Sequence, residues 1–373
     1  ANFALIVGQN FQPWDIFLPV GISFFTFQSL SYTIDVYRGE LRPLDSLLDY
    51  AFYVSFFPQL VAGPIVRARD FAPQIRKPLV INNRMIAMGV YLIVIGLFKK
   101  AVISDYISIN FVDRVFDNPL RYTGVENLFG LIGYAMQLYC DFSGYSDMAI
   151  GIVLLGFRFP TNFNAPFKAD SVGDFWRRWH ISLSSWIRDY VYISLGGNRK
   201  GDLRTCFNIF ITMLLAGLWH GASWNFVIWG ALFGLAQVVH RTFRVNILHH
   251  DRHYRSQGVK RFFAVLSTFV FVLFTFMVFR NSDMQGVVDM LTQMFTKFHP
   301  EVAVQCVTGY VWVFVLVVFG FVSHWLPQAW ESRMVAYLSK CNLLVYVLLL
   351  TGVIFLICQV KTSDVQPFIY FQF

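Results

Sequence analysis

The chain has 373 residues, of which 56% are hydrophobic and 14% are charged, and its formal net charge is +8. A soluble domain carries about a quarter of charged residues, so this composition excludes an ordinary soluble globular protein and indicates a chain that crosses a membrane several times. The positive charge is compatible with several kinds of anionic partner and selects none of them.

Apolar runs recur along the whole chain. Each approaches or exceeds the ~20 residues that a spanning helix needs, so the sequence predicts an all-α polytopic membrane protein with eight to eleven helices, some of them short. The chain begins at Ala1 without the basic flank and small-residue site of a cleavable signal, and without an initiator methionine, so we expect that N-terminal residues are missing. The apolar runs cover residues 14–34, 47–66, 86–112, 125–157, 206–240, 261–280, 307–326 and 342–359.

The run QLYCDFSGYSDMAIG, residues 137–151, places two carboxylates in an apolar context. Carboxylates at membrane depth need partners, so we predict a supporting role in which they bind Arg177, Arg178 or a helix N-terminus and fix the helix bundle. Direct catalysis is the alternative. The predicted supporting residues are Asp141, Ser143, Tyr145 and Asp147.

Residues 158–206 form an amphipathic, aromatic and basic segment that is too polar to span a bilayer. We expect it to lie at the cytoplasmic interface or to dip into the protein. Its aromatic and basic side chains alternate, which suits either a face that anchors in lipid headgroups, the interpretation that the segment alone favours, or a pocket for an anionic, acylated donor. These side chains are Trp176, Arg177, Arg178, Trp179, His180, Trp186 and Arg188.

His220 is an ionisable residue inside the apolar stretch LLAGLWHGASWNFVIWG, residues 214–230. A histidine at membrane depth is a functional-site hypothesis by default, and the alternative is a core histidine bonded to a backbone carbonyl. Basic segments at 158–206 and 241–261 flank this stretch, and the positive-inside rule places both in the cytoplasm. A re-entrant pair of half-helices that meet around residues 217–223 satisfies that rule. The alternative is one long tilted helix with a basic loop outside.

The connector HHDRHYR, residues 249–255, contains three histidines, His249, His250 and His253. A zinc site needs three or four converging ligands, and this run has no HExxH or CxxC frame, so we predict no metal.

Six motifs, taken together and in order, resemble the membrane-bound O-acyltransferase family, and more narrowly its bacterial branch of alginate and cell-wall O-acetylases and of the D-alanyl transfer protein of teichoic acid. The resemblance covers most of the chain, although residues 241–366 are generic by comparison. The motifs are PVGISFFTFQSLSYTIDVYRG (19–39), FFPQLVAGPI (56–65), YCDFSGYSDMAIG (139–151), FWRRWHISLSSWIRDYVYISLGGNR (175–199), LAGLWHGASWNFVIWG (215–230) and PFIYFQF (367–373).

The resemblance implies one transmembrane domain over residues 1–373, with helices around a central funnel or tunnel and with re-entrant and interfacial helices. It implies that His220 is the family's invariant histidine and that His180 matches a second one. Neutral imidazole suits a base that deprotonates an attacking hydroxyl, so we assign His220 as the base. We expect His180 to orient the donor or to stabilise the developing oxyanion. The residues predicted to line a donor site or tunnel are Trp176, Arg177, Arg178, Trp179, Arg188, Trp219, Trp224 and Asn225.

The terminal motif at 367–373 contains Tyr370, whose hydroxyl suits a covalent acyl relay. The alternative is an aromatic interfacial anchor.

The family implies an enzyme of the bacterial inner membrane that passes an acetyl or similar acyl group from a cytoplasmic thioester, acetyl-CoA or an acylated carrier protein, to an extracytoplasmic polysaccharide. We expect a periplasmic SGNH-type partner and membrane lipid as partners, and neither a bound cofactor nor nucleic acid. The alternatives are D-alanyl transfer to a teichoic acid-type polymer, and a non-catalytic transporter or a scaffold of an export complex.

Overall fold

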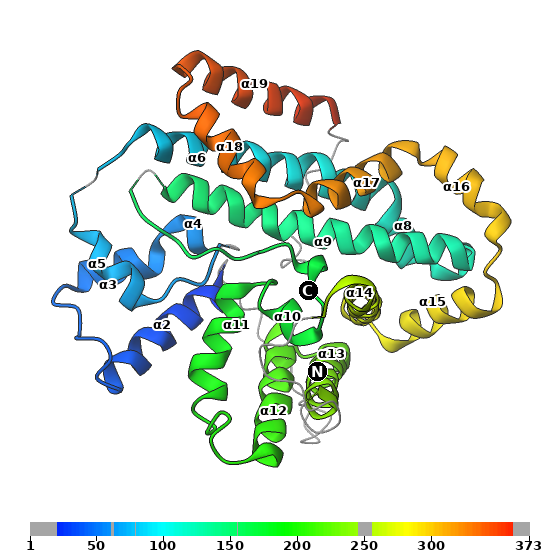
Figure 1. The fold of residues 1–373 in the computed structure, drawn as a ribbon, viewed down its shortest axis with the longest axis horizontal. Helices are drawn as coiled ribbons and strands as arrows, with labels where there is room; N and C mark the ends of the chain where they lie inside the picture. Colours follow the sequence, from blue (N-terminus) through cyan, green and yellow to red (C-terminus); the bar gives the residue numbers. More distant parts are fainter. Residues whose placement is uncertain (1–20, 61–62, 79, 155, 245–255, 361–373) are drawn as a thin grey trace, which may run out of the picture.

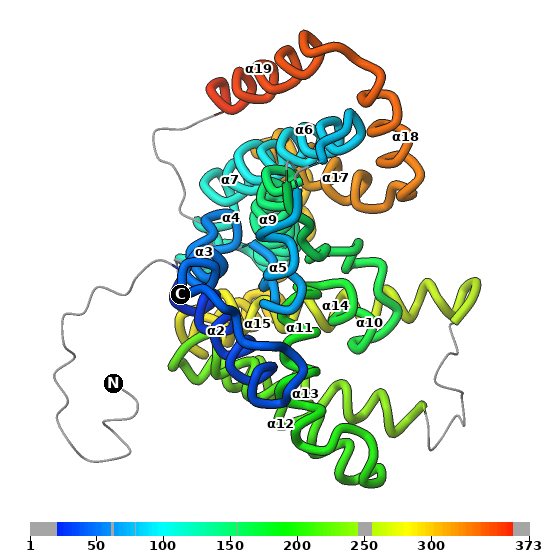
Figure 2. Tube along the Cα trace, turned by 90° about the vertical axis from the view of Figure 1, so that its left-hand side faces the viewer, coloured from blue at the N-terminus to red at the C-terminus, as the bar shows by residue number. Residues whose placement is uncertain are grey.

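The computed structural model describes residues 21–60, 63–78, 80–154, 156–244 and 256–360. Within these ranges all regular structure is helical, which confirms the predicted all-α class. Figures 1 and 2 show the helices gathered around one long central helix, α9 (Gly124–Val153). The other α-helices are α2 (Ile22–Tyr37), α3 (Leu47–Ser55), α4 (Phe57–Leu60), α5 (Ala68–Ile75), α6 (Asn83–Leu97), α7 (Asp105–Ile107), α8 (Asp113–Asp117), α10 (Val172–Trp176), α11 (Ile181–Ile187), α12 (Asp202–His220), α13 (Trp224–Thr242), α14 (Gly258–Arg280), α15 (Met284–Thr296), α16 (Ala303–Gly309), α17 (Val311–Trp325), α18 (Gln328–Leu338) and α19 (Leu343–Val360).

The start of α9 is fixed by a capping box. The Thr123 hydroxyl accepts a hydrogen bond from the Glu126 backbone N–H, and the Glu126 carboxylate accepts one from the Thr123 backbone N–H at 2.8 Å. The helix then runs for 30 residues, and at 1.5 Å per residue it is about 45 Å long. This length is enough to pass through a bilayer core and to support helices at both of its ends.

A continuous helical run from Asn83 to Asp117 lies against α9 at backbone distance. A Cβ atom on Gly96 would lie 2.5 Å from the carbonyl oxygen of Gly144, and one on Gly89 would lie 2.9 Å from that of Gly151. Small residues at helix contacts of this kind let two backbones approach closely within a membrane. The two glycine pairs therefore set the packing of α6 on α9.

The same run contains two π-helical segments, η1 (Phe98–Ser104) and η2 (Ser108–Val112). From η1, the Lys99 ammonium binds the Asp147 carboxylate at 2.7 Å, and the Lys100 ammonium binds that of Asp141 at 2.6 Å. The prediction of arginine or helix-terminus partners for these carboxylates is therefore wrong, because lysines of the neighbouring helical run bind both of them. These ion pairs bridge the helical run to α9.

The predicted break around His220 is present, and it separates two complete helices. The helices α12 and α13 have 19 residues each and form an antiparallel hairpin, side by side in Figure 1. A Cβ atom on Gly217 would lie 2.2 Å from the carbonyl oxygen of Phe226, so the helices cross with almost no space between their backbones. At the far end, Arg241 binds Asp202 at 2.8 Å. The alternative prediction of a single tilted helix is therefore wrong. The basic segment before α12 and the basic segment after α13 meet the hairpin at the same end.

Four helices of the described part are long and apolar enough to span a bilayer, or five if a pair bent by 94° counts as one. This is fewer than the eight to eleven that the sequence predicts. In the apolar run at 47–66, the described residues form two short helices, α3 and α4, which are separated at Phe56. The backbone is extended at Phe56, so apolar composition alone overestimates the length of helix in this run. The spanning helices are Asn83–Asp117, Asp202–His220, Gly258–Arg280 and Leu343–Val360, with the bent pair Pro300–Gly309 and Val311–Trp325 as the fifth.

Candidate active site

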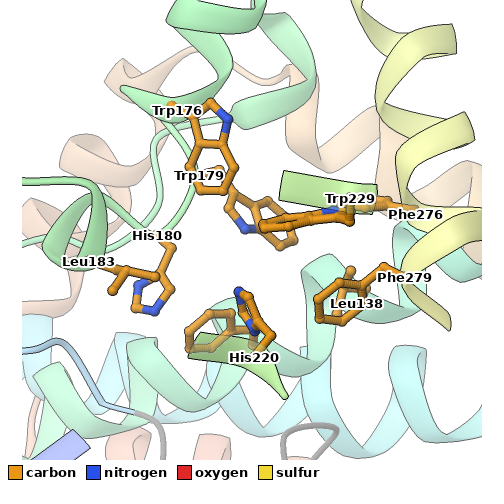
Figure 3. A pocket seen from close by; sticks show the side chains of 10 residues that line it. Leu138, Trp176, Trp179, His180, Leu183, His220, Trp229, Phe276 and Phe279 are labelled. Carbon is orange, nitrogen blue, oxygen red and sulfur yellow. The ribbon is translucent and has the colours of Figure 1, made fainter. Parts of the chain in front are cut away.

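A cavity lies where α9, the α10–α11 segment, the α12–α13 hairpin and α14 meet. Figure 3 shows its side chains converging from these elements, and both candidate histidines are among them. Its volume is about 20 Å³, which is enough for about one water molecule. The lining residues are Leu138, Phe142, Trp176, Trp179, His180, Leu183, His220, Trp229, Phe276 and Phe279.

His220 is the last residue of α12 and stands at the turn of the hairpin. Its imidazole lies among aromatic rings, with centroids 5.1 Å from Trp229, 5.0 Å from Phe279 and 4.7 Å from Trp219. The turn is tight, because a Cβ atom on Gly221 would lie 2.7 Å from the Phe226 ring. The hairpin thus delivers a polar ring into an apolar cage at the end of a long helix.

His180 immediately precedes α11 and is 1% exposed. Its backbone is left-handed, with φ 43° and ψ 55°. This conformation is strained for a residue other than glycine, and strained residues are frequent at functional sites. Its Nδ1 lies 3.0 Å from Asn162 Oδ1, and its Nε2 is buried without a hydrogen-bond partner in the described part of the chain. Burial lowers the pKa of this imidazole well below its usual range, and the nearby His220 lowers it further.

Two of the eight predicted donor-site residues, Trp176 and Trp179, line the cavity. The ring of Trp219 meets that of His220 edge-on, and Trp219 is not among the described residues that line the cavity. Trp224 is 64% exposed. Asn225 points elsewhere, because its amide donates to the backbone oxygens of Val278 and Asn281 and so ties α13 to the end of α14.

The three predicted arginines lie outside the cavity. Arg178 binds Asp174 at 2.7 Å, and Arg177 binds the same carboxylate while its side chain remains 70% exposed. Arg188 binds Asp189 with its side chain 62% exposed. The side chains of Arg177 and Arg188 therefore face outward, where an anionic partner can reach them, whereas that of Arg178 is only 19% exposed.

The tryptophans of this segment are internal, so the interpretation that favoured a headgroup-anchoring face is wrong for them. Trp179 is 7% exposed and stacks on Phe175. Trp186 is 5% exposed, and its indole N–H donates to the backbone oxygen of Phe27 at 3.0 Å. The segment therefore dips into the protein, which is one of the two locations predicted for it from the sequence.

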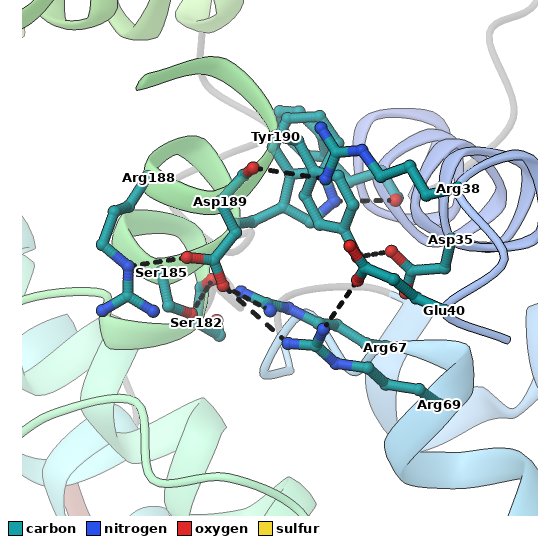
Figure 4. A network of polar contacts seen from close by, with 12 residues as sticks. Asp35, Arg38, Glu40, Arg67, Arg69, Ser182, Ser185, Arg188, Asp189 and Tyr190 are labelled. Carbon is teal, nitrogen blue, oxygen red and sulfur yellow. Dashed lines mark hydrogen bonds and ion pairs between the residues drawn. The ribbon is translucent and has the colours of Figure 1, made fainter. Parts of the chain in front are cut away.

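A polar network fixes the end of α11 to two distant segments (Figure 4). The carboxylate of Asp189 binds Arg67 at 2.6 Å and Arg188 at 2.7 Å. The hydroxyl of Tyr190 donates to Asp35 of α2 at 2.7 Å, and Arg38, which directly follows α2, donates to the backbone oxygen of Asp189. Burial raises the pKa of Asp189, but the hydrogen bonds from Arg188 and Arg67 outweigh it and hold this pKa below its usual range. The network fixes the far end of α11, the helix that His180 immediately precedes.

The predicted supporting residues lie along α9 beside the site. Asp141 and Asp147 make the lysine ion pairs described above, and Ser143 is buried one residue from Phe142 of the cavity. Tyr145 is half-buried and packs against the main core. These positions suit a supporting role, and none of the four is a described lining residue.

Sequence reasoning missed Asn162 and Ser182, which contact His180 directly. Both are ordinary polar residues in a segment rich in them, so the only available signal was their nearness to His180 in the sequence. Tyr370, the 367–373 motif and the histidines at 249–253 lie outside the described residues, and their predicted roles stay predictions.

The comparisons with known proteins agree on one family. The sequence model of the membrane-bound O-acyltransferase family matches residues 40–280. The chain is 42% identical over 296 residues to the probable alginate O-acetylase AlgI of Pseudomonas aeruginosa, covering 78% of this chain and 55% of that protein. It is 39% identical over 320 residues to the peptidoglycan O-acetyltransferase of Helicobacter pylori, covering 79% and 60%.

A teichoic acid D-alanyltransferase of Bacillus subtilis is more distant, at 29% identity over 286 residues, covering 72% of this chain and 70% of that protein. The chain thus spans between half and two thirds of the length of the two O-acetylating relatives. The predicted family is confirmed: the chain belongs to the membrane-bound O-acyltransferase family.

Proposed function

We propose that the protein transfers an acyl group from a thioester to a hydroxyl at the cavity between His180 and His220. One observation supports this proposal above the others. Two histidines that are 40 residues apart in the chain line the same small aromatic cavity, one at the turn of a helical hairpin and the other in a strained backbone conformation. Strain and buried polar groups gathered at one cavity are typical of catalytic sites.

The chemistry follows from the groups present. In acyl transfer the hydroxyl oxygen attacks the thioester carbon, its proton passes to a base, the C–S bond breaks, and the leaving sulfur takes up a proton. A neutral imidazole accepts the proton, and an N–H donor stabilises the carbonyl oxygen as it becomes negative. We propose that His180 and His220 divide these two tasks. The sequence-based assignment gives the base to His220.

The substrates are proposed from the names of the relatives. Two of them are named for O-acetylation, of alginate and of peptidoglycan, so we propose an acetyl or similar small acyl group and an extracytoplasmic polysaccharide acceptor. D-alanyl transfer to a teichoic acid-type polymer is the second candidate, because a D-alanyltransferase is a more distant relative. We place the protein in the bacterial inner membrane. A periplasmic SGNH-type partner would carry out the step to the acceptor.

The donor side is proposed from the exposed charges. Acetyl-CoA and an acylated carrier protein both carry phosphate, and guanidinium groups are suited to bind it. The outward-facing Arg177 and Arg188 are the candidates for this contact, since each keeps most of its side chain in solvent beside the segment that contains His180.

Ester content of the envelope tests the proposal. A strain without the gene is complemented with wild type or with His220→Ala at equal membrane abundance, and ester-linked acyl groups on envelope polysaccharide are measured. We expect wild type alone to restore the ester. A fully restoring His220→Ala protein would contradict the proposed chemistry and would favour a scaffold or transporter, neither of which requires this imidazole.

A further inference from the structure

Three arginines share two carboxylates at the end of α11 (Figure 4). Two of them bind opposite oxygens of Asp189, Arg67 at 2.6 Å and Arg188 at 2.7 Å. The third, Arg69, lies 3.8 Å from Asp189 and 3.5 Å from Glu40. Arg67 and Asp189 are 122 residues apart in the chain, so the fold and not the local sequence gathers these groups.

Arg38 joins this cluster through neutral partners. Its guanidinium donates to the Ser194 hydroxyl at 2.7 Å and to the backbone oxygen of Asp189 at 3.5 Å. It also lies over the Tyr190 ring, 5.5 Å from the ring centroid. These contacts fix the position of the guanidinium group, and none of them supplies a negative charge.

The cluster carries one more positive charge than negative. Besides Asp189 and Glu40 it contains Asp35, which is fully buried and accepts a hydrogen bond from the Tyr190 hydroxyl at 2.7 Å. Four guanidinium groups therefore stand against three carboxylates. An anion with a single negative charge, such as a phosphate diester, would neutralise the cluster.

Three of the four guanidinium groups are open to solvent. The Arg67 side chain is only 8% exposed, whereas that of Arg188 is 62% exposed, that of Arg69 is 38% exposed, and Arg38 is an exposed residue as well. Guanidinium binds phosphate through paired N–H donors, and arginines that are already oriented lose less conformational freedom on binding. The chemistry of the cluster therefore favours a phosphate group as its ligand.

The cluster is also at a suitable distance from the cavity. Helix α11 begins directly after His180, which lines the cavity, and Asp189 follows nine residues later in the π-helical segment η5 (Arg188–Tyr192). At about 1.5 Å per residue, about 13 Å of helix separates the two residues. The phosphopantetheine arm of acyl-CoA and of acyl carrier proteins has about thirteen bonds from phosphorus to sulfur, and since three backbone bonds span about 3.5 Å, the arm extends over about 15 Å. A phosphate bound at the cluster thus leaves the thioester within reach of the cavity.

We propose that Arg38, Arg69 and Arg188 bind the phosphate of the donor's phosphopantetheine arm and so place its thioester at the cavity. Arg188 belongs to the basic segment 158–206, which the positive-inside rule assigns to the cytoplasm, the side of the proposed donor. This site rests on the function proposed for the cavity and leaves the roles of its two histidines unchanged. A lipid headgroup offers the same phosphate chemistry, so the two sources need separate tests.

Two donors that differ only in the phosphate test this site. Transfer from acetyl-phosphopantetheine and from acetyl-pantetheine to de-esterified envelope polysaccharide is measured in membranes of the deletion strain that contain the full-length protein. Wild type should prefer the phosphorylated donor. Arg38→Gln keeps N–H donors for Ser194 and the backbone of Asp189 but removes the charge, so its kcat/KM for acetyl-phosphopantetheine should fall about 10- to 100-fold, mainly through KM. Its kcat/KM for acetyl-pantetheine should stay unchanged.

A second variant and a control accompany this measurement. Arg188→Gln should show the same donor-selective loss, because Arg67 still binds Asp189 and holds the end of α11. Arg333→Gln is the matched control, since this exposed arginine lies on α18, far from α11 in Figures 1 and 2. It should keep wild-type rates with both donors.

The lipid source is tested with purified protein in vesicles of phosphatidylcholine, with or without phosphatidylglycerol. If the donor phosphate is the ligand, the donor-selective loss in Arg38→Gln should be the same in both kinds of vesicle. A loss that occurs only with phosphatidylglycerol and is equal for both donors would assign the cluster to lipid and overturn the donor site.

The failure of this site and the failure of the proposed function give different results. Equal kcat/KM of wild type for the two donors, or a wild-type preference in Arg38→Gln, would overturn the phosphate site while transfer itself persists. An equal loss with both donors and a lower membrane abundance would leave the arginines a structural role only, which also overturns it. If wild type transfers acetyl neither from these donors nor from acetyl-CoA, the function proposed for the cavity fails as well.

Discussion

Replacing Gly217 with alanine is expected to impair the site through the geometry of the hairpin. The new Cβ atom would lie 2.2 Å from the carbonyl oxygen of Phe226, and real Cβ contacts essentially never fall below 3.0 Å. The helices α12 and α13 must therefore move apart by at least 0.8 Å, the difference between these distances. The contact is with backbone on both sides, so no side-chain rotation relieves it.

The displacement reaches the site because His220 follows Gly217 by three residues, less than one helical turn. A misplacement of about 1 Å in a catalytic group costs about 100-fold in rate. Overpacking of this kind also costs about 1–3 kcal/mol of stability. We expect Gly217→Ala to reach the membrane, to melt at a lower temperature and to lose about 100-fold in acyl transfer.

Transfer is measured as labelled acetyl incorporated into polysaccharide per folded protein, and folding by thermal melting in detergent. Gly352→Ala is the matched control, because it lies inside α19 and its Cβ would meet no atom within 4 Å. Wild-type transfer and melting in Gly217→Ala would refute the claim that backbone contact at this crossing positions His220.

Three other changes probe separate features. Lys100→Met leaves the Asp141 carboxylate without the ammonium that binds it at 2.6 Å, and it should destabilise the protein by about 3–5 kcal/mol in thermal unfolding; an added Asp141→Asn should recover part of this loss, and no loss in Lys100→Met would disprove a structural role for the pair. A covalent relay at Tyr370 requires that Tyr370→Phe abolish transfer at unchanged abundance, whereas full activity in this variant would leave the aromatic anchor as the role of this residue. Because burial depresses the folded pKa of His180, its stabilising contribution is present above the unfolded pKa of about 6.5 and is lost as the pH falls below it. Melting of wild type should therefore weaken more steeply from pH 7 to 5 than melting of His180→Gln, by up to about 1.4 kcal/mol per pH unit, whereas parallel curves would count against a neutral buried imidazole.

The helical class, the break near His220 and the supporting position of the α9 carboxylates follow from sequence because each depends on local composition. Basic segments on both sides of a single apolar run favoured the hairpin, since the positive-inside rule places both segments on the same side of the membrane. The presence of both histidines in one cavity depends on tertiary packing, and only the family resemblance indicated it.

The remaining features depend on contacts between distant segments. The lysines that bind Asp141 and Asp147 lie 40 or more residues away, on a helix whose π-helical turns are not visible in its composition. Trp186 resembles an interfacial anchor in sequence, but α2 supplies an acceptor for its indole N–H inside the protein. Asn162 has no local pattern that distinguishes it from Asn164, and only the folded loop gives one of them the imidazole of His180.

The narrowness of the cavity has a consequence for the competition between acceptors. A thioester is also open to attack by water, which is present at a far higher concentration than any sugar hydroxyl. The cavity has room for about one water-sized molecule among side chains of Trp, Phe, Leu and His, and its polar atoms are the ring nitrogens of those tryptophans and histidines. One such molecule fills this volume, which keeps bulk water away from the two histidines. Enclosure of this kind limits the loss of an activated acyl group by hydrolysis.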